Sequence, residues 1–391
     1  MSSSSGLRRL LLPLTPLYQF GLARRERRLA TGREPIRRLR FPVISIGNLS
    51  TGGAGKTPLT IALAQALTRR GFAVDGLSRG YSRRSKEAAR VDPGGTAEEF
   101  GDEPLLIARQ AGVPVYVAPQ RYDAGVLAER AEGHGQVSGE VRLVHTSGAK
   151  ALINSAGATP GINPRPAAPT DLTAACDAGV LAESEFLYPA EAAPAPPQVV
   201  HILDDGFQHR QLHRDIDILL LNQVDWHDRL LPAGNLREAL RAAARASVIA
   251  IPATEPELEA ELRGWGWNGP IWRLHRRMES RAIDAPVFAF CGLARPEQFF
   301  AGLETAGLDV SGSYAFPDHH TYTARDLDRL AAQASAVGAT TLLTTEKDEV
   351  RLAGLRTSLA IATVHLRTEI EDEPAALDWV TDRLKLISWG S

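Results

Sequence analysis

Cysteine is scarce in this chain of 391 residues, which contains only Cys176 and Cys291. The two do not form a CxxC pair, and neither belongs to a cysteine–histidine cluster. The sequence therefore argues against a disulfide framework and against a structural zinc site, which is built from clustered cysteine and histidine ligands. This cysteine usage is typical of a protein in a reducing compartment.

The chain also lacks a long hydrophobic run near its N-terminus. Leu10–Leu22 is the most apolar segment there, but a spanning helix needs about 20 apolar residues, and this segment contains Pro13 and Pro16. Arg8 and Arg9 precede it, as in a signal peptide, yet arginines rather than a small-residue cleavage site follow it. The sequence thus favours neither a transmembrane helix nor a signal peptide.

Acidic residues are rare in the first 40 positions, which contain ten arginines against Glu26 and Glu34, for a local charge of +8. The formal net charge of the whole chain is −2, so the remainder carries −10. Apolar side chains beside an arginine cluster are typical of a segment that lies among the headgroups of an anionic membrane. We expect this for residues 1–39; the alternatives are a helix packed on the folded domain and an arm that binds nucleic acid.

From residue 42 onward, short apolar runs alternate with helix-periodic segments. Val43–Ile46 is a buried-type strand, and apolar residues from Leu59 to Leu67 have the spacing of a helix that ends at Gly71. Further strands are expected at 72–74, 113–117, 199–203, 216–221, 287–291 and 341–344, and helices at 296–303 and 324–336. This alternation predicts an α/β fold with a mostly parallel sheet flanked by helices.

Between the first strand and its helix lies a glycine-rich segment that ends in Gly-Lys-Thr. In a P-loop, backbone N–H groups of such a segment surround phosphate oxygens at a helix N-terminus. We therefore expect a P-loop NTPase-like fold in which the nucleotide is bound by Ser50, Thr51, Gly52, Gly53, Ala54, Gly55, Lys56 and Thr57. Lys56 would reach the β- and γ-phosphates, and the Thr57 hydroxyl would bind Mg²⁺. The pattern has glycine where Ser50 stands, and the alternative is a glycine-rich turn without nucleotide.

Asp204 and Asp205 follow the strand predicted at 199–203. A P-loop enzyme needs a carboxylate at the end of a neighbouring strand to organise Mg²⁺, so both are candidate metal ligands together with Thr57. The alternative is a pair of aspartates that initiates a turn before Gly206.

The pattern divides the chain into an interfacial segment at 1–39, a P-loop domain at 40–279 and a smaller C-terminal α/β domain at 280–391. Within the P-loop domain, residues from about 132 to 197 are dominated by alanine, glycine and proline and have no sustained period. Such composition indicates a flexible surface insertion.

Several motifs resemble those of the tetraacyldisaccharide 4'-kinase family. The clearest are Asp204–His209 (DDGFQH) and Ile46–Pro58 (IGNLSTGGAGKTP), whose serine at position 50 is shared with the family. Further similar segments are Leu77–Tyr81, Gly101–Pro104, Ala118–Asp123, Leu231–Gly234, Leu236–Glu238, Phe316–His320 and Thr344–Asp348. The resemblance extends to about residue 352, except that the insertion is longer than the family's usual link and Asn235 stands where proline is commoner.

The resemblance implies a kinase of lipid A biosynthesis. Such an enzyme uses ATP and Mg²⁺ and transfers the γ-phosphate to the 4'-hydroxyl of a tetraacylated glucosamine disaccharide 1-phosphate. It also implies a peripheral or monotopic protein at the cytoplasmic face of the bacterial inner membrane. Its partners would be the glycolipid and the anionic membrane surface, with no nucleic acid and no obligate protein partner, and residues 40–279 would form the kinase domain.

Site residues follow from the same resemblance. Asp102 would act on the acceptor hydroxyl with His319 as its partner, because a positioned carboxylate accepts the proton of a poorly nucleophilic sugar hydroxyl. The catalytic set is completed by Lys56, Arg237 and Glu238, an arginine here serving to neutralise charge on the transferring phosphate. Weaker assignments are substrate contacts by Arg79, Tyr81 and Arg121, the arginines on phosphate and the tyrosine on the sugar.

Each of these catalytic roles has a purely structural alternative. Asp102 before Glu103 is typical of a helix N-terminus, Asp318–His320 of a polar loop, and Arg237–Glu238 of an ion network on a helix surface. Glu346–Asp348 is expected to be a structural loop outside catalysis. For the whole chain, the alternative is a P-loop switch or assembly ATPase that controls a partner protein, which requires neither the Asp102–His319 pair nor a membrane anchor.

Overall fold

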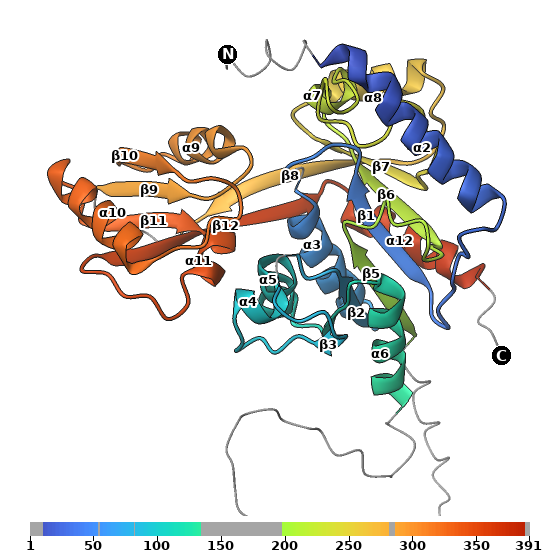
Figure 1. Cartoon of the computed structure of the whole chain (residues 1–391), viewed down its shortest axis with the longest axis horizontal. Coiled ribbons are helices and arrows are strands. Elements are labelled where there is room, and N and C mark those ends of the chain that lie inside the picture. The colour runs from blue at the N-terminus through green and yellow to red at the C-terminus, as the bar shows by residue number, and fades with distance from the viewer. Residues whose placement is uncertain (1–10, 54, 82, 134–197, 281–285, 388–391) are drawn as a thin grey trace, which may run out of the picture. The chain divides into compact units, whose positions relative to one another are not determined.

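The computed structural model describes residues 11–53, 55–81, 83–133, 198–280 and 286–387. Within these residues, twelve strands form one sheet in the order β10-β9-β11-β12-β8-β7-β6-β1-β5-β2-β4-β3 (Figure 1). The strands are β1 (Val43–Asn48), β2 (Ala73–Ser78), β3 (Ala89–Arg90), β4 (Val115–Val117), β5 (Val199–Asp204), β6 (Ile216–Leu220), β7 (Val248–Pro252), β8 (Ile271–Glu279), β9 (Val287–Cys291), β10 (Val310–Ala315), β11 (Thr341–Thr345) and β12 (Ala360–Ile370). Neighbouring strands are parallel except for the β8–β12 and β3–β4 pairs. The predicted fold class is confirmed.

Helices connect and cover these strands. The α-helices are α2 (Thr15–Ala30), α3 (Lys56–Arg69), α4 (Ala97–Phe100), α5 (Asp102–Ala111), α6 (Arg121–Gly133), α7 (Gln223–Trp226), α8 (Pro256–Gly264), α9 (Pro296–Thr305), α10 (Ala324–Ala336), α11 (Glu346–Arg351) and α12 (Glu373–Lys385). Two short 3₁₀-helices, η1 (Leu12–Leu14) and η2 (Leu240–Arg245), complete the described elements.

Successive residues of a strand point to opposite faces of the sheet, and both faces are buried here. In β7, Val248 and Ala250 belong to a core cluster with residues of α3, α5 and α12, whereas Ile249 and Ile251 belong to a second cluster with residues of α8. Burial on both faces explains why the strands read as short, continuous apolar runs in the sequence.

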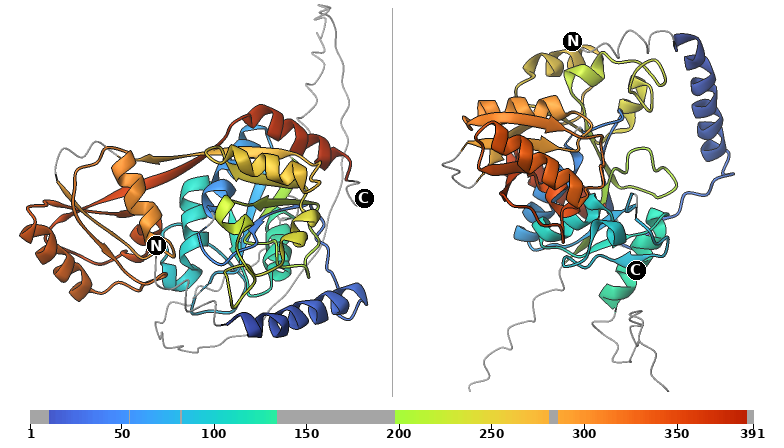
Figure 2. Two further views of the ribbon diagram at one scale, coloured as in Figure 1. Left: turned by 90° about the horizontal axis from the view of Figure 1, so that it is seen from above. Right: turned by 60° about the vertical axis from the view of Figure 1, so that its left-hand side comes forward.

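The last described helix, α12, packs into the same core as the first strand. Leu377, Val380 and Leu384 of α12 share a buried cluster with Ile44 of β1 and Leu59 of α3. The strands β8 and β12 run antiparallel between this part of the sheet and β9–β11 (Figures 1 and 2). The division of the chain at residue 280 stays a prediction, and beyond Gly133 the predicted insertion lies outside the described residues.

The functional motifs lie where parallel strands end. β1 lies between β5 and β6, and β2 and β4 follow on the β5 side, all parallel. Their carboxyl ends therefore meet at one edge of the sheet, where ligands bind in open α/β sheets. The segments that leave this edge carry the predicted P-loop after β1, Asp205 after β5, Arg79 and Tyr81 after β2, and Arg121 after β4.

The predicted apolar N-terminal segment is mostly helical, as η1 and the first half of α2. Pro16 lies in the first turn of α2, where a missing backbone N–H has no cost. Of the helices that the structure describes, not one has the length and apolar character needed to cross a membrane.

Gly47 in β1 is a packing constraint that we expect to be measurable. A Cβ at this position would lie 2.6 Å from Cβ and 2.8 Å from the backbone N of the fully buried Phe207. Gly47→Ala should therefore overpack the core and lower the free energy of unfolding by about 1–3 kcal/mol in urea denaturation. Gly264→Ala is the matched control, because a Cβ there meets nothing within 4 Å. Equal stability of the two variants would contradict this packing argument.

Candidate active site

The predicted P-loop has the backbone geometry that its glycines allow. Gly52 and Gly55 have positive φ values of 120° and 84°, and Lys56 begins α3 directly after Gly55. Ser50 replaces a glycine, and its hydroxyl accepts a hydrogen bond from Asn48 Nδ2 at 3.0 Å and donates one to Asp225 Oδ2 at 2.8 Å. Ala54 lies outside the described residues. The loop thus joins the buried strand β1 to the N-terminus of α3, as a phosphate-binding loop must.

Two cations converge on one carboxylate behind the loop. Lys56 Nζ lies 3.1 Å from Asn48 Oδ1 and 3.6 Å from Asp205 Oδ1. Arg237 donates to both carboxylate oxygens of Asp205, at 3.0 and 3.2 Å, and to Asn48 Oδ1 at 2.6 Å. Burial alone would raise the pKa of Asp205, but Lys56, Arg237 and Arg121 outweigh it and hold that pKa well below its usual range. Asp205 is therefore ionised at neutral pH.

Asp204, one residue earlier, has the opposite environment. It is the last residue of β5, it is buried, and its Oδ1 accepts a hydrogen bond from Thr60 Oγ1 at 3.2 Å. Burial, together with the nearby carboxylates of Glu103 and Asp205, raises the pKa of Asp204 to about 7. One member of the predicted metal pair thus gains or loses a proton near neutral pH.

These side chains suit a Mg²⁺ ion that is bound together with a nucleotide. Mg²⁺ in such sites takes one or two carboxylates, with phosphate oxygens and water supplying the remaining ligands. Asp204, Asp205 and the hydroxyl of Thr57, the second residue of α3, offer oxygen donors of these kinds, and their role as metal ligands stays a prediction. The described residues contain no group of three His, Cys, Asp or Glu side chains that could hold a metal ion by themselves.

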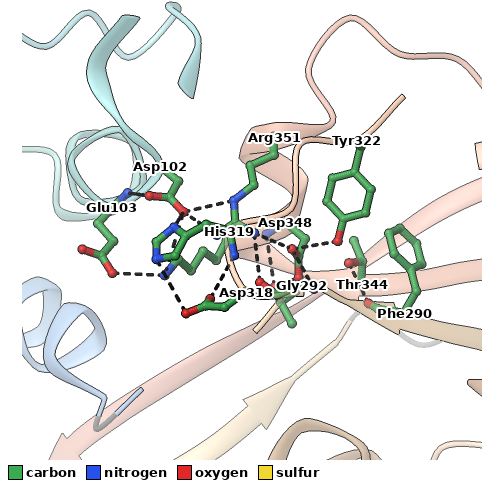
Figure 3. A network of polar contacts seen from close by, with 12 residues as sticks. Asp102, Glu103, Phe290, Gly292, Asp318, His319, Tyr322, Thr344, Asp348 and Arg351 are labelled. Atoms are coloured by element: carbon green, nitrogen blue, oxygen red, sulfur yellow. Dashed lines mark hydrogen bonds and ion pairs between the residues drawn. The ribbon is translucent and has the colours of Figure 1, made fainter. Parts of the chain in front are cut away.

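Asp102 and His319 are in direct contact, although 217 positions separate them (Figure 3). His319 Nδ1 lies 3.0 Å from Asp102 Oδ2. Asp102 is the first residue of α5, where its Oδ1 also accepts the backbone N–H of Glu103 at 3.0 Å. His319 has a positive φ of 57°, a rare backbone conformation for a residue with a Cβ, and such local strain is typical of functional sites. The two side chains thus lie in contact, and their catalytic role stays a prediction.

Two cations from α11 also contact Asp102. Arg351 binds Asp102 Oδ2 through Nε, at 3.0 Å, and through Nη2, and Lys347 Nζ lies 3.8 Å from the same oxygen (Figure 3). Burial would raise the pKa of Asp102, but the hydrogen bond from His319 and the charges of Lys347 and Arg351 hold it well below its usual range. Asp102 is thus a fixed anion.

Sequence reasoning missed this contribution of α11. Glu346–Asp348 was expected to be a structural loop, but the segment forms the first turn of a helix, and Lys347 also bonds Glu103 Oε1 at 3.1 Å. Arg351 is anchored in turn by Asp348 Oδ1 and the Gly292 carbonyl, each at 3.0 Å. The four-residue spacing of Lys347 and Arg351 places them on one helix face, which is the signal that could have linked them.

The three weaker substrate candidates lie at the same sheet edge. The ring of Tyr81, which is exposed, lies 5.1 Å from that of His319. Arg121 begins α6, and its buried Nε has no hydrogen-bond partner among the described residues. Arg79 is exposed directly after β2, and its charge is among those that lower the pKa of Arg121. An unpaired guanidinium edge beside a second arginine suits an anion.

Glu238, a predicted catalytic residue, forms an ion pair with Arg245. Its Oε2 accepts a bond from Arg245 Nη2 at 2.7 Å, and the Arg245 guanidinium lies 4.7 Å from the centre of the Phe207 ring. A catalytic role for Glu238 stays a prediction. Its ion pair with Arg245 positions the guanidinium that packs on Phe207, two residues after Asp205.

The N-terminal helix contacts the same segments. The Tyr18 hydroxyl of α2 donates to the Arg237 carbonyl at 2.9 Å, and Arg25 Nη2 donates to the Gln208 carbonyl at 2.8 Å. Gln208 Nε2 in turn donates to the Asn48 carbonyl at 2.8 Å. Helix α2, on the outside of the fold in Figure 2, is thereby tied to the loops that hold Asp205 and the end of β1.

Comparisons with known proteins agree with this geometry. The family described as tetraacyldisaccharide-1-P 4'-kinase matches residues 7–137 and 184–385. The tetraacyldisaccharide 4'-kinase of Koribacter versatilis is 35% identical over 378 residues, which are 94% of this chain and 96% of the relative. That of Dechloromonas aromatica is 32% identical over 386 residues, which are 96% of this chain and 92% of the relative.

A solved structure is similar over nearly the whole length. The crystal structure of LpxK from Aquifex aeolicus in complex with ATP superposes with a TM-score of 0.65 at 29% sequence identity. The match covers 97% of this chain and 99% of that one.

The raised pKa of Asp204 predicts proton release when Mg²⁺ and ATP bind. Because burial raises the pKa of Asp204 to about 7, its carboxyl carries a proton in part of the molecules at neutral pH, whereas a metal ligand must be ionised. Binding should therefore release protons, and affinity should fall as the pH decreases below 7. Isothermal titration in two buffers of different ionisation enthalpy measures this release, and Asp204→Asn should abolish it. Binding at pH 7 without any exchange of protons would refute the assignment.

Proposed function

The chain belongs to the tetraacyldisaccharide 4'-kinase family, and we propose that its P-loop and its Asp102–His319 pair together transfer the γ-phosphate of ATP to the 4'-hydroxyl of a tetraacylated disaccharide 1-phosphate. The observation that carries this assignment of residues is the 3.0 Å contact of His319 with Asp102, from segments far apart in the sequence. A nucleotide site and a pair suited to accept a proton are what a kinase acting on an alcohol needs.

The relatives favour a kinase over a P-loop switch ATPase. Lys56 and Asp204 serve either activity equally well, because both bind nucleotide and metal. A switch that only hydrolyses ATP uses water as its nucleophile, whereas a kinase must hold an acceptor hydroxyl next to a group that takes its proton. The Asp102–His319 contact is therefore the feature that supports transfer to an acceptor.

In the proposed mechanism, residues of the sheet edge hold the nucleotide. The Thr51 N–H donates to the Asn235 carbonyl at 2.8 Å, so other N–H groups of the P-loop bind the phosphates together with the dipole of α3. Lys56 and Arg237 reach the β- and γ-phosphates from beside Asp205. Mg²⁺, when bound by Asp204, Asp205 and Thr57, would draw charge from the phosphate oxygens. Electrostatic stabilisation and positioning are most of what phosphoryl transfer requires of a protein.

The pair receives the proton of the acceptor hydroxyl. A contact of 3.0 Å between a carboxylate oxygen and an imidazole nitrogen needs a proton between them, and the low pKa of Asp102 assigns that proton to Nδ1. Nε2 of His319 is then the basic nitrogen, and Asp102 orients the ring and stabilises the imidazolium. Asp102 acts on the hydroxyl as one half of this pair, because a carboxyl of such low pKa does not keep a proton by itself.

We further propose that Arg79 and Arg121 bind the phosphate of the glycolipid and that Tyr81 packs on its sugar beside His319. The guanidinium fork matches phosphate oxygens, and an exposed aromatic ring covers the apolar face of a pyranose.

We propose that the N-terminal segment binds the membrane surface, because it carries exposed apolar side chains. Large exposed apolar side chains lie in η1, in α2 and at the residue before η1: Leu11, Leu12, Leu14, Leu17 and Phe20. A recess of about 680 Å³ next to them is lined by Phe20, Ala23, Arg24, Arg27, Arg28, Thr31, Arg33 and Glu34. Apolar side chains beside arginines suit the headgroup region of an anionic leaflet, and we place the protein at the cytoplasmic face of the inner membrane, without nucleic acid or an obligate protein partner.

The activity is tested by its product. Wild-type protein with Mg²⁺, ATP and the tetraacylated disaccharide 1-phosphate should add one phosphoryl group to the lipid, as seen by mass spectrometry. Asp102→Asn should lower kcat by about 10²–10⁴-fold, because the amide no longer orients the imidazole or stabilises its charge. Asp382→Asn, on the exposed surface of α12, is the matched control. A near-normal rate for Asp102→Asn would eliminate this role.

Membrane association is tested with single charges on α2. Leu17→Glu and Phe20→Glu, at positions 71% and 64% exposed, should reduce cosedimentation with anionic vesicles, because each places a carboxylate where an apolar side chain would enter the leaflet. Leu386→Glu is the control, since Leu386 is 78% exposed at the other end of the chain. Equal cosedimentation of all three variants would contradict the proposal that α2 binds the membrane.

A further inference from the structure

Arg295 lies directly against the P-loop, although it comes from the C-terminal part of the chain. It occupies the segment between β9 and α9. A Cβ at Gly52 would stand 3.7 Å from Nε of Arg295 and 3.9 Å from Cβ of Ala294. Gly52 is one of the residues whose backbone N–H groups surround phosphate in a P-loop, so this guanidinium lies next to the phosphate position.

A chain of hydrogen bonds holds Arg295 at this place. Arg295 Nη2 donates to Asp225 Oδ1 at 3.3 Å, and Asp225 Oδ2 accepts the hydroxyl of Ser50 at 2.8 Å. The Asp225 side chain is fully buried, and that of Arg295 is 18% exposed. The contact accounts for the serine at position 50, because its hydroxyl links the loop to the carboxylate that orients Arg295.

A second arginine reaches the other end of the loop. Arg276 of β8 lies so close to Gly55 that a Cβ there would come within 2.5 Å of its Nη2. Burial by surrounding protein lowers the pKa of Arg276, with the neighbouring charge of Arg295 as a further cause. Two neighbouring guanidinium groups repel each other, and an anion that binds between or beside them relieves that repulsion.

We propose that Arg295 is a catalytic residue that contacts the γ-phosphate of ATP during transfer, with Asp225 as its positioning residue. This inference rests on the proposed function. In the transfer step, the bond from the γ-phosphorus to the β–γ bridging oxygen breaks, and its electron pair stays on ADP. A bond from the 4'-oxygen to the γ-phosphorus forms, and the hydroxyl proton goes to His319. Arg295 neutralises charge that spreads over the equatorial oxygens, the role of an arginine supplied within the same chain.

A purely structural role would predict a different outcome. A buried carboxylate needs a cation, and Arg295 meets that need for Asp225. If that were its only function, removing the guanidinium would weaken the fold or the loop and would affect every nucleotide equally. A transition-state contact affects only ligands that mimic the transferring phosphate.

The test compares binding of ADP with binding of ADP plus aluminium fluoride, a mimic of the transferring phosphoryl group, in the presence of Mg²⁺. Arg295→Ala should weaken binding of the mimic by about 10²–10³-fold and lower kcat by a similar factor, while affinity for ADP changes by less than about threefold. Arg295→Lys should recover part of the loss, because it keeps the charge but not the fork. Arg383→Ala, an exposed arginine of α12, is the control.

Three results would overturn the proposal. Arg295→Ala that binds the mimic as wild type does, or that loses ADP and mimic affinity equally, would give Arg295 no part in transfer. If Arg295→Ala does not fold, Arg295→Lys decides, since full activity and full mimic affinity of that variant would exclude a fork-shaped contact. Asp225→Asn should show the same selective loss in milder form. Failure of wild-type protein to phosphorylate the lipid, with mimic binding still dependent on Arg295, would instead refute the proposed function alone.

Discussion

A buried carboxylate has to be paired, and Asp102 sets the arrangement of this site through that requirement. Removing one partner of a buried ion pair costs about 3–5 kcal/mol, because the remaining charge is left without compensation. Asp102 takes its partners from two distant segments, with His319 from the loop before α10 and Arg351 and Lys347 from α11. The charge of one side chain on α5 thereby fixes where the histidine lies and which part of the C-terminal half contacts the P-loop half of the sheet.

The surroundings of Asp348 show how firmly this contact is anchored. Asp348 is fully buried and accepts the hydroxyl of Tyr322 at 2.9 Å, the backbone N–H of Gly292 at 3.1 Å and Nη1 of Arg351 (Figure 3). Burial beside Asp348 raises the pKa of Tyr322, so its hydroxyl stays a donor. The bonds to Asp348 and to the Gly292 carbonyl therefore fix the Arg351 side chain, so that it loses little further conformational freedom when it pairs with Asp102.

The sequence predicted the parts of the site whose geometry is local. The P-loop follows from one strand, one glycine-rich turn and one helix, and Asp204 follows from the end of a neighbouring parallel strand. The contact of Asp102 with His319 came from the family resemblance, because residues alone favour a helix N-terminus at Asp102. The interactions of Arg351 and Arg295 were not predictable from the sequence. Each depends on how the C-terminal part of the fold places a short segment, α11 or the turn before α9, next to residues of the N-terminal part. Likewise, the apolar pattern of α12 does not say that it packs beside α3.

Asp225 and Asp102 play parallel parts at the two ends of the proposed reaction. Each is a buried anion that holds a cation from the C-terminal half, Arg295 beside the nucleotide loop and Arg351 beside the acceptor pair. Both pairs lie in surroundings where Coulomb interactions are stronger than in water, so the same cations also act strongly on any phosphate that enters. In the proposed reaction, a phosphate near Gly52 competes with Asp225 for the Arg295 guanidinium. When Arg295 turns to the phosphate, the buried Asp225 carboxylate still accepts the hydrogen bond of the Ser50 hydroxyl. The serine in the loop therefore allows the arginine to be shared between protein and substrate, which a glycine at that position would not.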